Sequence, residues 1–180
     1  EFYGDIGIND RLYFTDVNTG YALGSSSGNT MLYKTTDGGA NWSVVYNNAN
    51  GFFKLHFFDS QNGYTKRFIG FEPKFAVTAD GGVTWTDYNL PAGTDANGTE
   101  FFLNKNIGWL SNYSYANNYF GLYKTVNGGQ TWTLVSNNIV NYFVFTDENT
   151  GYAFKGGGMI FKTTNSGADW SPIPSNHNPN

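Results

Sequence analysis

The chain has 180 residues, enough for one domain with a real core, and a formal net charge of −4. This charge gives no basic face for nucleic acid, and no apolar run approaches the roughly 20 residues that span a bilayer. Because the chain has no cysteine, disulfides and thiolate metal sites are excluded. We expect no cofactor, and we single out no metal ligands, but calcium held by the clustered Asp and Asn turns stays open.

The composition favours strands and turns over helices. Aromatic residues make up 19% of the chain, charged residues only 13%, and there are 23 glycines. The surplus of Asn, Thr, Ser, Gly and Tyr over Lys and Glu is typical of secreted bacterial surface proteins, so we expect a secreted or cell-surface location. The chain begins "EFYGD", without methionine, and we interpret it as a mature or excised piece of a longer polypeptide.

One polar turn that ends in tryptophan recurs along the chain. Its copies are "KTTDGGANW" from Lys34, "VTADGGVTW" from Val77, "KTVNGGQTW" from Lys124 and "KTTNSGADW" from Lys162. The tryptophans lie about 40 to 45 residues apart, which is the period of propeller blades. A catalytic site is normally built once, so the repetition indicates architecture.

Each copy predicts four strands. The first is an apolar run, as in "RLYF" and "NYFVF", and the second opens on a glycine and an aromatic residue, as in Gly20-Tyr21 and Gly151-Tyr152. The third alternates apolar and polar residues, and the fourth begins at the tryptophan. Pro172 and Pro174 suit an edge strand, since proline cannot donate to a ladder. After a leader strand or linker over 1–10, we therefore predict a propeller domain over 11–175, with blades at about 11–48, 52–90, 99–138 and 140–175, and a tail over 176–180.

The recurring turn has a structural explanation. An Asp or Asn beside glycine can hydrogen-bond backbone amides within the turn that joins strands three and four. The tryptophan that follows can then bury its ring against the next sheet. One blade cannot cover both of its faces alone, so each copy needs neighbours. The residues to which we assign this structural role are Asp37, Trp42, Asp80, Trp85, Asn127, Trp132, Asn165 and Trp170.

These turns resemble the Asp-box (BNR-like) repeat, Ser/Thr-x-Asp-x-Gly-x-Thr/Ser-Trp, of sialidases, sortilin-type receptors and some glycoside hydrolases. The second copy, Thr78 to Trp85, matches every defining position, whereas Asn41, Asn127 and Asn165 depart from it in the others. The longer repeat is similar to propellers of photosystem II stability/assembly-factor type and to repeats in secreted Bacteroidetes proteins. The resemblance covers roughly residues 11 to 175. It implies an all-β propeller of four-stranded antiparallel blades and, since this repeat accompanies many activities, leaves the function open.

The number of blades leaves alternatives. Propellers of the similar families usually have more than four blades. The chain could close as a four-bladed ring, which is the small end of the known range. It could also form part of a larger ring, or associate with another chain that covers its open edges. Further blades from the same polypeptide or from another chain are therefore possible partners.

The best candidates for binding lie between strands two and three, on the face opposite the recurring turns. There the copies differ most: the second has "KRFIGFEPK" and the third "SNYSYANNYFG". Variable aromatic loops on a repeated scaffold commonly bind ligands, here a protein or a glycan, although alternate residues could simply face a neighbouring blade. The candidate binding residues are Lys66, Arg67, Phe68, Phe71, Tyr113, Tyr115 and Tyr119.

Enzymatic interpretations find less support. A sialidase-like site needs three arginines, and the chain has only Arg11 and Arg67. Glycoside hydrolysis needs two carboxylates at a set separation, and Asp95 with Glu72 is a conceivable pair that nothing singles out. His56 and His177 lack a third ligand at a recognisable spacing, so a transition-metal site is not expected. We expect a non-catalytic binding or scaffold module; the alternatives are a carbohydrate-active enzyme domain or accessory module, and a purely structural segment of an adhesin or filament.

Overall fold

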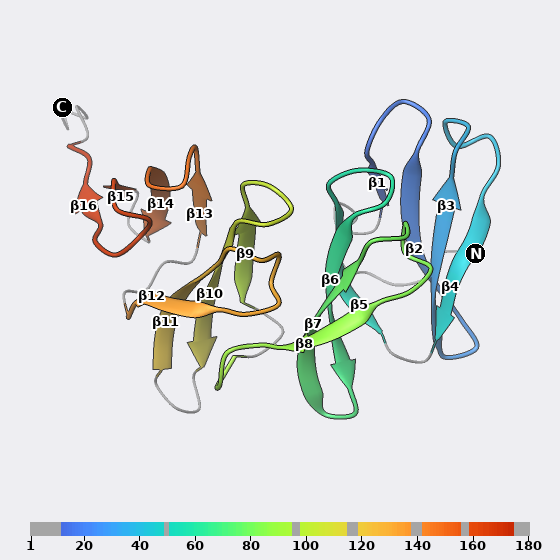
Figure 1. Cartoon of the computed structure of the whole chain (residues 1–180), viewed down its shortest axis with the longest axis horizontal. Coiled ribbons are helices and arrows are strands. Elements are labelled where there is room, and N and C mark those ends of the chain that lie inside the picture. Colours follow the sequence, from blue (N-terminus) through green and yellow to red (C-terminus); the bar gives the residue numbers. More distant parts are fainter. Residues whose placement is uncertain are drawn as a thin grey trace, which may run out of the picture. The chain divides into compact units, whose positions relative to one another are not determined.

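The computed structural model describes residues 12–48, 51–94, 98–114, 119–137, 142–155 and 159–174. These residues form four antiparallel sheets of four strands each, with the strands of every sheet in chain order and no helix within the described ranges (Figure 1). The prediction of an all-β chain built from four-stranded blades is confirmed. The chain divides into two compact units, Glu1–Leu90 and Pro91–Asn180, and each unit holds two blades.

The first unit contains the first and second blades. The strands of the first blade are β1 (Leu12–Phe14), β2 (Gly20–Ser26), β3 (Asn29–Thr35) and β4 (Ser43–Asn48). Those of the second blade are β5 (Phe52–Phe57), β6 (Gly63–Ile69), β7 (Glu72–Thr78) and β8 (Thr86–Asn89).

The second unit contains the third and fourth blades. The strands of the third blade are β9 (Thr99–Phe102), β10 (Gly108–Ser114), β11 (Tyr119–Thr125) and β12 (Thr133–Ser136). Those of the fourth blade are β13 (Tyr142–Phe145), β14 (Gly151–Lys155), β15 (Met159–Thr163) and β16 (Ser171–Pro172). As expected from its prolines, β16 is an edge strand that pairs only with β15 among the described strands.

The core of the first unit lies between its two blades. Tyr21 of β2 stacks on Phe57 of β5, with ring centroids 3.5 Å apart and planes 2° from parallel. Leu23, Leu32 and Leu55 complete the buried cluster around this pair. Burial of this apolar surface between the sheets is what holds the two blades together.

The core of the second unit repeats this plan. Trp109 of β10 stacks on Phe145 of β13 at 3.6 Å and 4°. Leu122, Phe143 and Ala153 surround the pair. In both units the aromatic residue that follows the glycine of strand two therefore meets the phenylalanine that ends strand one of the following blade.

The recurring turns, which we call the tryptophan turns, are locked by a threonine and an Asp or Asn. In the first blade the buried Thr35 hydroxyl donates to Asp37 Oδ1 (2.8 Å) and accepts from the amide of Gly39 (3.0 Å). Asp37 Oδ1 also accepts from the amide of Asn41 (2.9 Å). Gly38 and Gly39 have φ of 70° and 94°, values that favour glycine. These are the bonds of an Asx-type turn.

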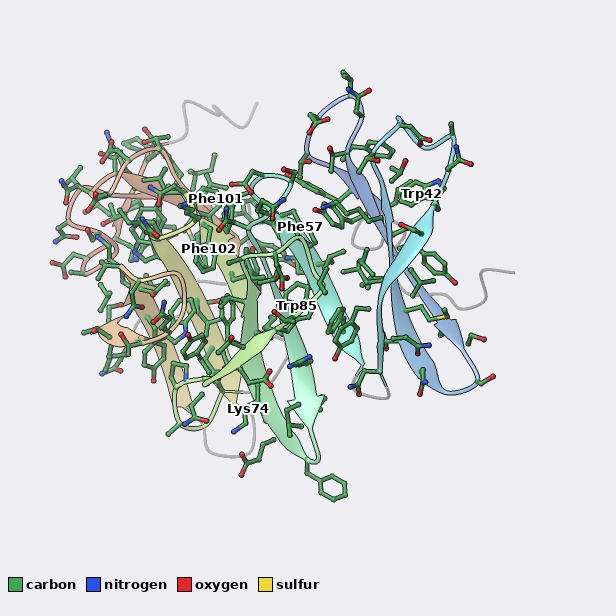
Figure 2. All side chains as sticks on the ribbon, turned by 45° about the vertical axis from the view of Figure 1, so that its right-hand side comes forward. Trp42, Phe57, Lys74, Trp85, Phe101 and Phe102 are labelled. Carbon is green, nitrogen blue, oxygen red and sulfur yellow. The ribbon has the colours of Figure 1, made fainter. Side chains whose placement is uncertain are left out.

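The tryptophans pack in the opposite direction to the one predicted from the sequence. Trp85 of the second blade joins the cluster of Tyr21 and Leu32 in the first blade, and Trp170 joins that of Trp109 in the third. Both rings therefore pack at the joint with the preceding blade of their own unit. Trp85 lies beside Phe57 of its own blade, with ring centroids 6.1 Å apart and an edge-on arrangement (Figure 2).

Candidate binding surface

One end of every blade is occupied by turns that bond to each other. The tryptophan turn donates a backbone amide to the turn between strands one and two of the same blade, as in Gly38 to Asn18 O (2.9 Å) and Gly128 to Asn106 O (2.8 Å). The equivalent bonds are Gly81 to Gln61 O and Ser166 to Asn149 O. The turns between strands one and two therefore lie at the same end of each blade as the tryptophan turns, and the opposite end remains for other contacts.

The recurring aspartates at this end act inside their own turns. Asp16 Oδ1 accepts from the amides of Asn18 and Thr19 (both 2.8 Å), and Asp147 does the same with Asn149 and Thr150 (both 2.8 Å). Bonds from these backbone amides lower the pKa of both carboxyls below the ordinary value. They are held as carboxylates that order a turn.

At the opposite end, the "KRFIGFEPK" segment is a hairpin rather than the open loop expected from the sequence. The whole of it except Gly70 and Phe71 belongs to β6 and β7, which pair up to Ile69 and Glu72. Gly70 has φ of 64° at the first central position, which is the pattern of a type II′ turn. The pairing of β6 with β7 continues through the predicted loop from Lys66 opposite Phe75 to Ile69 opposite Glu72, and this leaves only two residues for the turn.

Two of the predicted binding residues, Lys66 and Arg67, are buried within β6. Arg67 donates from Nε and Nη2 to the two carboxylate oxygens of Asp87 on β8 (2.6 and 2.7 Å) and from Nη1 to the Tyr46 hydroxyl of the first blade (2.7 Å). Burial lowers the pKa of the Arg67 guanidinium, but the hydrogen bonds that it donates to Asp87 and Tyr46 outweigh burial and raise the pKa. Arg67 therefore ties the two blades together instead of facing a ligand.

Phe71 is different, because its side chain is fully exposed at the tip of the hairpin. Ile69, which precedes the turn, is also exposed, whereas Phe68 is partly buried. The ring projects from a two-residue turn whose flanking residues, Ile69 and Glu72, are paired. The ring is held out in solvent.

Polar bonds anchor the base of this tip. Lys74 Nζ donates to Glu72 Oε2 (2.6 Å) on the same strand and to Asn89 Oδ1 (2.9 Å) on β8. The hydrogen bond from Lys74 lowers the pKa of the Glu72 carboxyl. Figure 2 shows Lys74 on this hairpin. The sequence analysis named Glu72 only as a conceivable partner of Asp95 and did not single out Lys74 or Asn89, although Glu72 and Lys74, two positions apart on a strand, share a face.

We define the hairpin tip as Ile69, Phe71, Glu72, Lys74 and Asn89. The other predicted residues belong to the third blade. There the backbone of β10 and β11 pairs from Gly108 opposite Thr125 to Ser114 opposite Tyr119, so the third blade carries a hairpin of matching length. Tyr115 and the side chains of Tyr113 and Tyr119 lie outside the described residues.

The other candidate sites lie in structural surroundings. His56 contacts the rings of Tyr13, Phe58 and Tyr64 at centroid distances of 5.2, 4.9 and 5.1 Å. Asp95 and His177 fall outside the described residues. Within the described ranges, no three His, Cys, Asp or Glu side chains gather as a metal site would require. A search for a sufficiently long apolar helix to cross a membrane found none in the same ranges.

Comparison with solved structures shows the β-propeller fold. The chain aligns with an uncharacterized protein of Listeria monocytogenes EGD-e (TM-score 0.70, 12% identity, 96% of this chain and 56% of that one). It also aligns with YCF48 bound to D1 peptide (TM-score 0.56, 18% identity, 91% and 54%). A third match is the GH74 enzyme of Niastella koreensis (TM-score 0.59, 20% identity, 94% and 30%).

This chain thus spans little more than half the length of the first two of these proteins. No family model and no curated protein matches it. The comparisons establish the propeller fold, and any function has to be argued from the surface of the chain itself.

Proposed function

We propose that the chain is a non-catalytic binding module of a secreted or cell-surface protein and that it contacts a protein ligand through the hairpin tip. The observation that carries the proposal is the full exposure of Phe71 on a two-residue turn between paired strands. A fully solvated aromatic ring gains free energy when a partner covers it, and aromatic residues are enriched among the residues that dominate interfaces.

The surroundings of Phe71 fit this role. Ile69 adds apolar surface, and the Glu72–Lys74 pair supplies both charges within three residues of Phe71. Because Lys74 is held by Glu72 and Asn89, little side-chain freedom is lost when a partner binds. Pre-ordered polar groups around an apolar anchor are the usual composition of a protein-binding surface.

The propeller neighbours support a protein ligand in a general way. One of them, YCF48, is described as bound to a peptide. We further propose that the tryptophan turns are Asp boxes, since the hydroxyl, carboxylate and glycine bonds of Thr78, Asp80 and Gly82 have the roles that the repeat assigns to them. These turns lie at the other end of the blades and do not compete with the hairpin tip.

The runner-up is a carbohydrate-binding or carbohydrate-cleaving role, which the structural likeness to GH74 enzymes favours. The same exposed ring could stack on a sugar. The carboxylates described above already serve turns and ion pairs, as Asp16, Asp87 and Glu72 do. We therefore place binding ahead of hydrolysis.

A peptide-display library tests the proposal. We expect peptides selected on the wild-type chain to lose at least tenfold in affinity for Phe71→Ser and to keep their affinity for Val83→Ser. Val83 is a suitable control because it is also exposed and apolar but lies in a tryptophan turn. Selected peptides that bind the Phe71→Ser chain equally well would contradict the proposal. Binding or cleavage of xyloglucan by the wild-type chain, lost in Phe71→Ser, would favour the runner-up.

A further inference from the structure

The joint between blades inside each unit has two unlike sides. We call the trailing face the side of a blade that carries the strand-two aromatic, such as Tyr21 and Trp109. The leading face is the opposite side, which carries the phenylalanine at the end of strand one, such as Phe57 and Phe145. In both units a trailing face packs on the leading face of the following blade.

Polar bonds at the rim of this joint orient it. In the first unit the Tyr21 hydroxyl and Lys34 Nζ both donate to the carbonyl of Ser60 in the following blade (2.8 and 3.0 Å). In the second unit Trp109 Nε1 donates to Ser166 O (2.9 Å) and Lys124 Nζ to Glu148 O (3.4 Å). Donors on the trailing face thus meet backbone carbonyls of the turns on the leading face.

The fourth blade carries a complete trailing face that is exposed. Strand register makes Phe154 and Ile160 the equivalents of Leu23 and Leu32, since each pair lies directly opposite across strands two and three. Leu23 and Leu32 are 6% and 0% exposed, whereas Phe154 and Ile160 are 47% and 49% exposed. Four large apolar side chains are exposed on this face: Tyr142, Val144, Phe154 and Ile160.

The donors of the joint are also present there. Lys162 lies over the ring of Tyr152 at 5.8 Å, as Lys34 lies over the ring of Tyr21 at 5.2 Å. Tyr152 and Lys162 are opposite each other across β14 and β15, which is the register of Tyr21 and Lys34. The fourth blade therefore repeats both the apolar and the polar parts of a trailing face.

The first blade carries an exposed leading face. Phe14 occupies the position of Phe57 and Phe145, opposite the strand-two glycine, and is 41% exposed where they are 0% and 3% exposed. Leu12, Trp42 and Val44 are exposed around it. Large contiguous apolar surface of this kind marks an interface.

The surroundings of the second glycine of the tryptophan turn also show that no blade packs on the leading face of the first blade in the described structure. A Cβ built on Gly82 would lie 2.5 Å from Leu32 of the preceding blade, and one on Gly167 would lie 2.5 Å from Leu122. A Cβ on Gly39 meets only Phe14 and Trp42 of its own blade, at 3.8 Å. The pocket that a preceding blade fills in the other two cases is vacant here.

We propose that the trailing face of the fourth blade binds the leading face of the first blade in a second copy of this chain. Tyr152 would stack on Phe14, and Lys162 Nζ would donate to the carbonyl of Val17, which corresponds to Ser60. The two faces are complementary because each repeats one side of a joint that is already formed inside the units. This continuity with an existing interface is what selects a second copy as the occupant.

The length of the chain fits a closed pair. Two copies joined head to tail at both ends supply eight blades, within the range of four to eight found in propellers. A head-to-tail contact that closes on itself gives a defined dimer instead of a filament. The solved proteins of this fold that this chain half covers are also longer than one copy, since the chain spans 54% and 56% of them.

Sedimentation analysis of the 180-residue chain tests the proposal. We expect a mass twice that of the 20.0 kDa chain, which falls to the single-chain value on dilution. Ile160→Asp and Phe14→Asp should each give single chains at concentrations where the wild-type chain is dimeric, because either charge would be buried in every joint. Val126→Asp, at an exposed apolar site in a tryptophan turn, should stay dimeric. Unchanged far-ultraviolet circular dichroism identifies variants that remain folded.

A mixture of the two variants tests the head-to-tail arrangement. The Ile160→Asp chain keeps its leading face and the Phe14→Asp chain keeps its trailing face, so together they form one intact joint. We expect the mixture to regain the dimer mass at higher concentration than the wild-type chain needs. A wild-type chain that stays at the single-chain mass at its highest soluble concentration, or a dimer that neither variant dissociates, would overturn the proposal.

Discussion

The first and second units solve the same packing problem with different chemistry. Both place two aromatic rings face to face between blades, with centroids 3.5 Å apart in one and 3.6 Å in the other. The buried partner in the first unit is Tyr21, whose hydroxyl bonds to a carbonyl, and in the second it is Trp109, whose indole nitrogen does so. Burial, with the charges of Asp59 and Asp16, raises the pKa of Tyr21 to about 12, so it stays a donor.

The tryptophan turns of the two units also make equivalent bonds with different side chains. Asp37 accepts from the side-chain amide of Asn41 (2.8 Å), whereas Asn165 donates its own side-chain amide to Asp169 (3.0 Å). Donor and acceptor have exchanged places, four residues apart. The bond to the backbone amide of the fourth residue on is the same in both, at 2.9 and 3.0 Å.

This difference shows which property the fold requires. The tryptophan turn requires a side-chain oxygen that accepts a hydrogen bond from a backbone amide. The joint between blades requires an aromatic ring that carries a hydrogen-bond donor at its edge. Neither the negative charge of the turn nor the identity of the ring is needed.

The two aromatic stacks should contribute equally to the free energy of unfolding. We expect Phe57→Ala and Phe145→Ala each to lower the free energy of unfolding by about 3–5 kcal/mol, because each leaves a cavity between blades. Phe71→Ala, at a fully exposed site, should change it by less than about 0.5 kcal/mol. Urea unfolding followed by tryptophan fluorescence measures these values. A large effect in one unit and a small one in the other would break the equivalence.

Substitution of the turn glycines that contact a preceding blade should lower the free energy of unfolding by a smaller amount. In Gly82→Ala and Gly167→Ala, the new methyl group meets Leu32 or Leu122 and adds overpacking of about 1–3 kcal/mol to the strain of a positive φ. Gly39→Ala has only the strain, about 1–2 kcal/mol. The measurement is chemical unfolding of dilute protein, where the joint proposed above is open. Equal losses at all three positions would show that the leucine contacts are unimportant.

The smallest expected effect is a loss of stability in acid. It should differ between the tryptophan turns, because the turn of the first blade uses the carboxylate of Asp37 where the turn of the fourth blade uses the amide of Asn165. Bonds from Asn41 and Thr35 lower the pKa of Asp37 from 3.8 to about 2. The unfolded chain therefore takes up the proton first, and the contribution of Asp37 is complete well above pH 3.8 and is lost as the pH falls toward about 2.

Asp37→Asn isolates this contribution. The variant should keep nearly the same stability at pH 7, since Asn127 and Asn165 already hold equivalent turns. It should also lose less stability than the wild-type chain between pH 4 and pH 2, as urea midpoints across this range would show. The same acid profile in both chains would mean that Asp37 contributes nothing through its charge.

The fold was largely readable from the sequence because its signals are local and repeated. Alternation and turn residues predicted all four blades, and Pro172 marked the edge strand correctly. The direction in which Trp85 packs was wrong, because a turn motif does not say which neighbour its ring meets. The hairpin of Lys66–Lys74 was taken for a loop because its aromatic residues resembled an insertion.

The candidate surface was less readable because its decisive contacts are distant in sequence. Nothing near Arg67 indicates that Asp87 and Tyr46 would enclose it from two other strands. Phe71 was among the predicted residues, but its full exposure depends on where a two-residue turn begins. Register of this kind is set by the pairing of whole strands, and a short sequence segment does not contain it.

The tryptophan turn has a consequence for how such chains grow. Its bonds close within the segment from Lys34 to Trp42 and onto Asn18 of the same blade. A duplicated repeat therefore encodes a sheet whose turns are stabilised by bonds within the same blade, without contacts from a neighbouring blade. Gene duplication and loss can lengthen or shorten the array by whole sheets, and each new copy is free to diverge at its far tip.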